Sequence, residues 1–117
     1  MFEIEFYELP NGKKPVKTFL DSLEPNMRAK AVDNIAILAE FGNMLREPYV
    51  KNIGNGLFEL RIRFAGDITR IFYFFAKGKL IILTNGFVKK TQKTPDREKQ
   101  MAIKYKAEYE RRLIKYG

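Results

Sequence analysis

The sequence predicts an α+β domain in which helices pack against an antiparallel β-sheet, with elements in the order β-α-α-β-β-β-β-α. Three observations support this prediction. The 117 residues are 45% hydrophobic, enough for one compact core but hardly for two, so we expect a single domain over residues 1–117. Apolar residues recur at helical spacing between residues 15 and 42 and form strand-like runs from residue 49. Short glycine-containing links separate those runs, as in β-hairpins.

The N-terminal part of the chain is predicted to form one strand and two helices. Segment 2–7 alternates apolar and polar residues as a half-buried strand does, and Pro10-Asn11-Gly12 supplies a turn. Pro15 and Pro25 each suit the first turn of a helix, where a missing N–H costs nothing. Gly42 offers a C-terminal stop for the second helix.

The C-terminal part is predicted to form four strands and a last helix. Thr94-Pro95-Asp96 is typical of a helix start, and apolar residues at helical spacing, including Tyr105 and Tyr109, then form one packed face. The aromatic residues at 72–75 are expected to belong to the core rather than to a surface that stacks bases. The predicted strands cover residues 49–53, 57–64, 68–76 and 79–88.

The charge of the chain favours a polyanionic partner. The formal net charge is +8, and residues 89–117 carry ten Lys or Arg against four Asp or Glu. Summed cationic potential raises the local concentration of phosphate-bearing ligands. We therefore expect nucleic acid as the first candidate partner and an anionic membrane surface as the second, with the basic C-terminal part as the contact region.

Two absent residue types restrict the chemistry. The chain contains neither cysteine nor histidine, which removes the usual zinc ligands, the usual general base near neutral pH and every Ser-His or Cys-His pair. Catalysis would have to use Lys, Arg, Tyr, Asp or Glu, and we expect neither a metal nor a cofactor. No apolar run approaches the roughly 20 residues of a membrane span, and the first ten residues are acidic, unlike a signal peptide. A cytoplasmic location is expected.

The strand-like run 57–64 carries the first candidate functional residues. Its even positions are apolar, which places Glu59, Arg61 and Arg63 together on the other face of the strand. Arg70 lies in the next run, where residues of both parities are apolar, so its face stays open. A charged residue on a strand is usually solvated, but two guanidinium groups in aromatic-rich strands would be costly without an anion or an acid to satisfy them.

A second cluster of possible phosphate donors follows the last strand. It consists of Lys89, Lys90, Thr91, Gln92, Lys93 and Thr94, and the alternative is a plain solvated loop. From residue types and spacing alone, the chain is a basic α+β domain that binds an anion.

The order of motifs adds a family resemblance. The strings GLFELRIRFAGDITRIFYFF and LTNGFVKKTQKTP, with PVKTFLDSL near the start, resemble the phage-derived Gp49-like branch of the HigB toxins, within the RelE/ParE superfamily. The resemblance covers nearly the whole chain. It implies a RelE-like antiparallel sheet flanked by helices, ribosome-dependent cleavage of mRNA, and a cognate antitoxin of the helix-turn-helix HigA type.

The resemblance also assigns roles to residues. The family's two arginines and its lysine pair fall on the candidate catalytic residues Arg61, Arg70, Lys89 and Lys90. The candidate RNA-binding residues, of which Gln92 and Thr94 match the tail of the family motif, are Lys51, Arg63, Gln92, Lys93 and Thr94.

The general base stays open at this point. Several members of the superfamily are discussed with a histidine or a C-terminal tyrosine as acid or base, whereas this chain has no histidine and its C-terminal tyrosines fit helix packing. Lys89 or Lys90, crowded by other cations, could shift toward the neutral form and serve, with Glu59 as a weaker candidate. Two alternatives remain, a ParE-like toxin that inhibits gyrase without cutting RNA, and a catalytically inactive module that binds RNA or an antitoxin.

Overall fold

The computed structural model of the chain describes residues 1–89 and 95–116. Its helices and strands follow the predicted order, with one added 3-10 helix after the second α-helix, and the α+β class is confirmed. In chain order the elements are β1 (Glu3–Phe6), α1 (Pro15–Ser22), α2 (Pro25–Phe41), η1 (Gly42–Met44), β2 (Val50–Gly54), β3 (Leu57–Phe64), β4 (Asp67–Phe75), β5 (Leu80–Lys89) and α3 (Asp96–Tyr116).

The first two helices begin at the predicted prolines, for local reasons. The carboxylate of Glu24 accepts hydrogen bonds of 3.1 Å from the backbone N–H groups of Asn26 and Met27, which caps α2 in front of Pro25. Gly42 ends α2 with a φ of +50°, and a Cβ there would lie only 2.1 Å from the ring of Phe2. Both the positive φ and the close ring therefore require glycine at this position.

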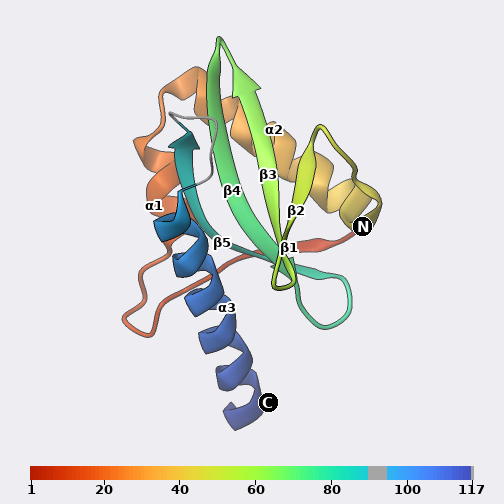
Figure 1. The fold of residues 1–117 in the computed structure, drawn as a ribbon, viewed down its shortest axis with the longest axis vertical. Coiled ribbons are helices and arrows are strands. Elements are labelled where there is room, and N and C mark those ends of the chain that lie inside the picture. Colours follow the sequence, from red (N-terminus) through yellow and green to blue (C-terminus); the bar gives the residue numbers. More distant parts are fainter. Residues whose placement is uncertain (90–94, 117) are drawn as a thin grey trace.

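The sheet has five strands in the order β1-β5-β4-β3-β2. Strands β2 to β5 form the antiparallel meander that the short links predict. The first strand differs from the prediction, because β1 pairs with β5 in parallel. Helices α1 and α2 carry the chain across the sheet between β1 and β2, so these two strands occupy opposite edges (Figure 1).

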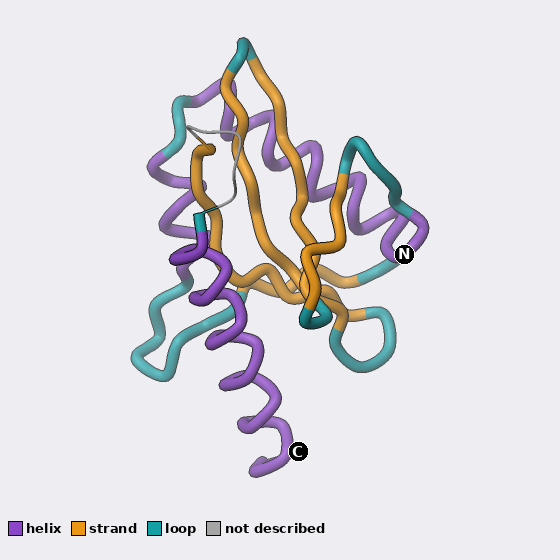
Figure 2. Tube along the Cα trace, viewed as in Figure 1, coloured by secondary structure: helices purple, strands orange, loops and turns teal. Residues whose placement is uncertain are grey.

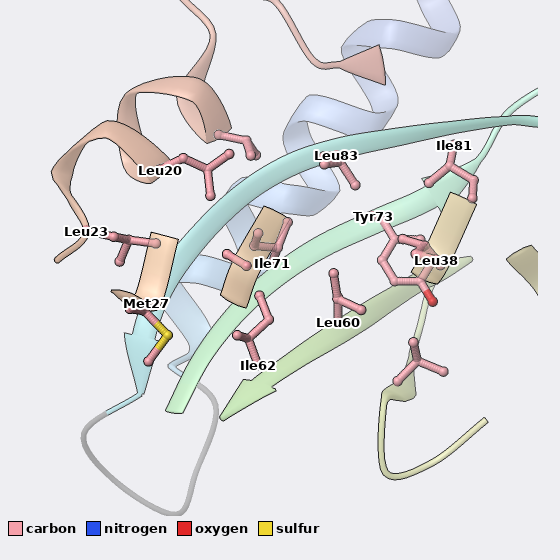
Figure 3. Close-up of a cluster of buried hydrophobic side chains, with 13 residues drawn as sticks. Leu20, Leu23, Met27, Leu38, Leu60, Ile62, Ile71, Tyr73, Ile81 and Leu83 are labelled. Carbon is pink, nitrogen blue, oxygen red and sulfur yellow. The ribbon is translucent and has the colours of Figure 1, made fainter. Parts of the chain in front are cut away.

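The two faces of the sheet are covered by different helices (Figure 2). Helices α1 and α2 cover one face through a cluster of buried apolar residues, which includes Leu60 and Ile62 of β3 and Leu20 and Leu38 of the helices (Figure 3). The ring of Phe19 approaches β5 so closely that a Cβ at Gly86 would lie 2.4 Å from it. This face is thus a well-packed apolar core.

Helix α3 packs on the opposite face and extends beyond the sheet (Figure 1). The cluster beneath it joins Tyr7, Leu57, Phe72, Phe74, Ile82, Phe87 and Ala102. Phe72, Tyr73 and Phe74 of β4 are each at most 1% exposed, and the half-buried Phe75 packs against the core of the other face, so the expectation that these residues belong to the core is confirmed. Among residues 1–89 and 95–116, none of the helices has the length and apolar character that crossing a membrane requires.

Candidate anion-binding site

The β3–β4 hairpin places the two candidate catalytic arginines opposite each other. Its two-residue turn consists of Ala65 (φ +50°) and Gly66 (φ +85°), and two consecutive positive φ values match the twist of a tight hairpin. This turn pairs Phe64 with Asp67 and fixes the register all along the hairpin. In that register Arg61 is the direct partner of Arg70, so both side chains lie on the same face of the sheet.

The face in question is the one covered by α3. Arg70 is in turn opposite Phe87 of β5, and Phe87 belongs to the cluster beneath α3. The alternation of β3 therefore holds as predicted, with Glu59 and Arg61 on the α3 face and Leu60 and Ile62 in the core of the other face. The face of Arg70, which the alternation left open, is now settled.

A single carboxylate lies between the two arginines. Glu59 Oε1 is 2.7 Å from Arg70 Nε and 3.6 Å from Arg61 Nε. Neither Nε group forms a hydrogen bond with this oxygen, so both contacts are ion pairs. The side chains of Glu59 and Arg70 are 1% and 2% exposed, and that of Arg61 is 18% exposed. Arg61 Nη1 also lies 3.7 Å from Oε1 of the exposed Glu47.

Arg70 keeps unused hydrogen-bonding capacity in this arrangement. Its Nη1 is buried and has no hydrogen-bond partner among the described residues. A buried donor without an acceptor costs about 1–3 kcal/mol, so such groups in folded proteins call for an explanation. Burial lowers the pKa of Arg70, and the neighbouring carboxylate of Glu59 offsets part of this effect. An anion bound at Nη1 would remove the cost.

Two lysines complete the cluster. Lys51 of β2 is the register partner of Glu59, and Lys89 at the end of β5 pairs with Ile68, two positions from Arg70 on the same face. Burial lowers the pKa of Lys89, and the positive charges of Arg70, Arg61 and Lys51 lower it further, while Glu59 acts in the opposite direction. The cluster therefore holds four cationic side chains around one buried carboxylate; we call it the arginine cluster (Lys51, Glu59, Arg61, Arg70 and Lys89).

The other predicted site residues are placed differently. Arg63 pairs with Ile68, which places it on the same face as the arginine cluster, but it is exposed and lies at the end of β3. The predicted positions Lys90, Gln92, Lys93 and Thr94 lie outside the described residues, so their part in the site remains a prediction. Tyr105 and Tyr109 of α3 pack against Tyr7 and Phe74, in agreement with the expected role in helix packing.

Tyr49 and Asn34, near the site, hold the backbone of Arg61, a role that was not predicted from the sequence. Strand β2 begins at Val50, the partner of Leu60, so the backbone of Arg61 lies past the end of this pairing and takes its hydrogen bonds from Tyr49 and Asn34. The N–H of Arg61 donates to the carbonyl of Tyr49 (2.8 Å), and its carbonyl accepts from Nδ2 of Asn34 in α2 (3.2 Å). The signal for Asn34 was present in the sequence, because it is a polar residue at helical spacing between the buried Ala31 and Leu38.

The described residues offer no ready metal site. Nowhere in segments 1–89 and 95–116 do three or more acidic side chains gather in a way that could hold a metal ion. The arginine cluster offers a set of cationic donors on four neighbouring strands, β2 to β5, and such a set suits a phosphate or another oxyanion.

Comparisons with known proteins agree with this reading of the fold and motifs. No curated protein sequence matches the chain. The family described as "Phage derived protein Gp49-like (DUF891)" matches residues 18–107, a span that contains every described residue of the arginine cluster. Because the match covers more than half of the chain, this protein belongs to the phage-derived Gp49-like family.

Proposed function

We propose that the protein is the toxin of a type II toxin–antitoxin system, an endoribonuclease that cleaves mRNA on the ribosome. The Gp49-like family is a toxin-like, phage-derived family related to RelE and HigB. The observation that carries the proposal is the pairing of Arg61 with Arg70 on neighbouring strands, with a buried donor of Arg70 left for an anion. The net charge of +8 fits RNA, a polyanion, as the partner of this protein.

The proposed reaction is attack of a ribose 2′-OH on the adjacent phosphate. The O2′–P bond forms and the P–O5′ bond breaks, leaving a 2′,3′-cyclic phosphate on one fragment and a 5′-OH on the other. Negative charge grows on the phosphorane, and stabilisation of developing charge is usually the largest catalytic term. Arg61 and Arg70 supply that stabilisation, and the mechanism itself requires neither metal nor cofactor.

Proton transfer is assigned to the lysines: a neutral lysine accepts the proton of the 2′-OH, and a protonated lysine gives a proton to the departing O5′. The lowered pKa of Lys89 increases its neutral fraction near physiological pH, which suits a general base for the 2′-OH. Lys90 remains the other candidate from the sequence. Glu59 shares the face of the arginines, but its carboxylate is engaged by both guanidinium groups, so we assign it to holding them in place.

The remaining candidate residues and partners follow from the same proposal. Lys51 and Arg63, together with Gln92, Lys93 and Thr94, would bind the RNA backbone on either side of the cleaved phosphate. The partner that silences the toxin would be a helix-turn-helix antitoxin of the HigA type. The site of action would be the cytoplasm, where translating ribosomes supply the substrate.

The test is mapping of mRNA 5′ ends shortly after induction of the protein in bacterial cells. We expect new ends inside translated frames, and their loss in the Arg61→Ala/Arg70→Ala double mutant, since removal of one donor to a developing oxyanion costs about 100- to 1000-fold in rate. A Lys13→Ala/Lys104→Ala double mutant removes the same charge from exposed positions and should keep the activity. Circular dichroism verifies that each variant folds.

The alternatives correspond to distinct outcomes of this experiment. Growth arrest without new RNA ends would contradict the proposal and favour a ParE-like gyrase inhibitor. Neither arrest nor new ends would indicate a catalytically inactive module that binds RNA or an antitoxin. New ends that persist in a folded Arg61→Ala/Arg70→Ala mutant would overturn the site assignment while leaving the activity.

A further inference from the structure

A pocket lies at the free edge of β3, next to the arginine cluster. Strand β2 pairs with β3 only as far as Leu60, so the last residues of β3 have no partner strand on that side. The space beside them is bounded by α2 and by the loop that enters β2. The pocket has a volume of about 240 Å³ and is lined by Lys30, Asn34, Ile37, Pro48, Tyr49, Arg61 and Arg63.

The residues that line the pocket include three apolar or aromatic side chains and three cations, Lys30, Arg61 and Arg63. Ile37, Pro48 and Tyr49 supply the apolar part, and Tyr49 is 47% exposed although it is a large aromatic residue. Neither Lys30 nor Arg63 forms an ion pair with any described residue. An exposed aromatic ring beside uncompensated cations is the combination by which proteins hold single-stranded nucleic acid, with bases stacked on the ring and phosphates at the cations.

The pocket is connected to the arginine cluster through one residue. The backbone of Arg61 is held at the pocket by Asn34 and Tyr49, whereas its guanidinium reaches Glu59 and Glu47. A nucleotide in the pocket would therefore lie close, along the same RNA strand, to a phosphate held by Arg61 and Arg70. The pocket is placed to hold the substrate beside the bond that is cut.

We infer that this pocket is a nucleotide subsite, which binds one base of single-stranded RNA against Tyr49 and a neighbouring phosphate through Lys30 and Arg63. The inference rests on the proposed function, because it names a second contact of the same substrate. Tyr49 is a positioning residue in this scheme, since it contacts a base and not the reacting atoms. It would contribute to the choice of cleavage position through the base that it accepts.

A tryptophan probe tests the subsite without any cleavage. The chain has no Trp, so Tyr49→Trp introduces a single indole that can still stack. We expect its fluorescence to be quenched on addition of a short 2′-O-methyl RNA, which cannot undergo the proposed cleavage. Leu113 of α3 is exposed to nearly the same extent (46%) and does not line this pocket, so Leu113→Trp is the matched control and should be unaffected.

Binding measurements supply the second readout. By fluorescence anisotropy with the same RNA, Tyr49→Ala should weaken binding about 5- to 150-fold, which corresponds to the loss of one base–aromatic stack, whereas Leu113→Ala should not. Lys30→Ala should make the salt dependence shallower by about 0.7 in the slope of log K against log salt, in contrast to Lys104→Ala on α3.

The outcomes separate the subsite from the proposed function. Unchanged RNA binding in Tyr49→Ala, or an unquenched Tyr49→Trp beside an RNA-binding wild type, would overturn the subsite and leave the nuclease proposal intact. RNA binding that depends on Tyr49 together with an absence of new RNA ends in cells would support the subsite and contradict the nuclease. No RNA binding by the wild-type protein would overturn the subsite.

Discussion

Two carboxylates on the α3 side of the sheet, Glu59 and Glu108, are both held by arginine, and the comparison between them separates a structural network from a functional one. Glu108 accepts a hydrogen bond of 2.5 Å from the hydroxyl of Tyr7 and is bound twice by Arg112. Arg112 also donates to the carbonyl of Glu8 (2.9 Å). In this network one carboxylate, that of Glu108, pairs with one guanidinium, that of Arg112, and the hydrogen bonds connect α3 to the segment that follows β1.

The arginine cluster around Glu59 is built differently. One buried carboxylate faces two guanidinium groups and two lysines, and the described residues leave a donor of Arg70 unused. A network whose members are all satisfied stabilises a fold, whereas a buried donor without an acceptor, crowded by further cations, is costly and persists where a ligand satisfies it. We therefore expect the Glu108 network to stabilise the fold and the arginine cluster to bind the anion of the proposed function.

The largest effect should follow from breaking the Glu59–Arg70 pair. Glu59→Met leaves the guanidinium of Arg70 buried without its counter-charge, and removing one partner of a buried ion pair costs about 3–5 kcal/mol. In the Glu59→Met/Arg70→Met double mutant we expect most of this loss to be recovered, because well-packed apolar replacements of buried pairs are often neutral or stabilising. Urea unfolding at neutral pH measures both.

The same double mutant separates a loss of RNA cleavage from a loss of stability. The double mutant should fold yet lack RNA cleavage, because it has lost the proposed charge stabiliser Arg70. A double mutant no more stable than Glu59→Met alone would show that the ion pair, and not the loss of compensation, determines stability here.

Much of the β3–β4 hairpin could be predicted from the sequence. The alternation in β3 places Glu59 and Arg61 on one face, and the structure agrees. The face of Arg70 could not be predicted, because its neighbours in β4 are apolar on both sides, one side facing α2 and the other facing α3. The face of Arg70 follows only from the register that the turn at Ala65 sets. A turn with a non-glycine residue at positive φ is hard to predict from a sequence.

Long-range contacts account for the rest. The parallel pairing of β1 with β5 and the hydrogen bond of Tyr7 to Glu108 join segments from the two ends of the chain, 101 residues apart in the second case. No local pattern encodes such a partner. For the same reason the engagement of Glu59 by two arginines, and the pocket beside Arg61, became visible only with the strands in place.

A smaller effect is expected from the second carboxylate. The hydrogen bonds from Tyr7 and Arg112 lower the pKa of Glu108, so its contribution to stability is present above its pKa in the unfolded chain and is lost as pH falls through the folded pKa. Glu108→Gln should therefore cost about 1–2 kcal/mol at pH 7, in the range for a hydrogen bond to a charged group in a partly exposed position. The difference from wild type should shrink in strongly acidic solution.

Thermal or urea unfolding over a series of pH values tests this sign. RNA cleavage by Glu108→Gln at a temperature where it stays folded should match the wild type, since Glu108 is outside the arginine cluster. Reduced cleavage by a fully folded Glu108→Gln protein would contradict the division into a structural and a binding network.

The smallest expected effect is electrostatic and concerns Lys89. Burial lowers the pKa of Lys89 most, the charges of Arg70 and Arg61 lower it further, and the charge of Lys51 has the smallest lowering effect of these. Lys51→Gln removes one of these positive charges, so the pKa of Lys89 should rise toward its ordinary value. A titration followed by the ¹³Cε resonance of Lys89 measures the shift directly, with Lys104→Gln on the exposed side of α3 as the control that should leave it unchanged.

The direction of that shift has a catalytic consequence. If neutral Lys89 is the general base, the alkaline rise of the cleavage rate should move to higher pH in Lys51→Gln, in step with the resonance. A resonance that moves while the rate profile stays in place would exclude Lys89 as the base, and Lys90 would become the remaining lysine candidate. Because Lys51 is exposed and lies on the edge strand β2, its replacement should leave the fold intact and make this small shift interpretable.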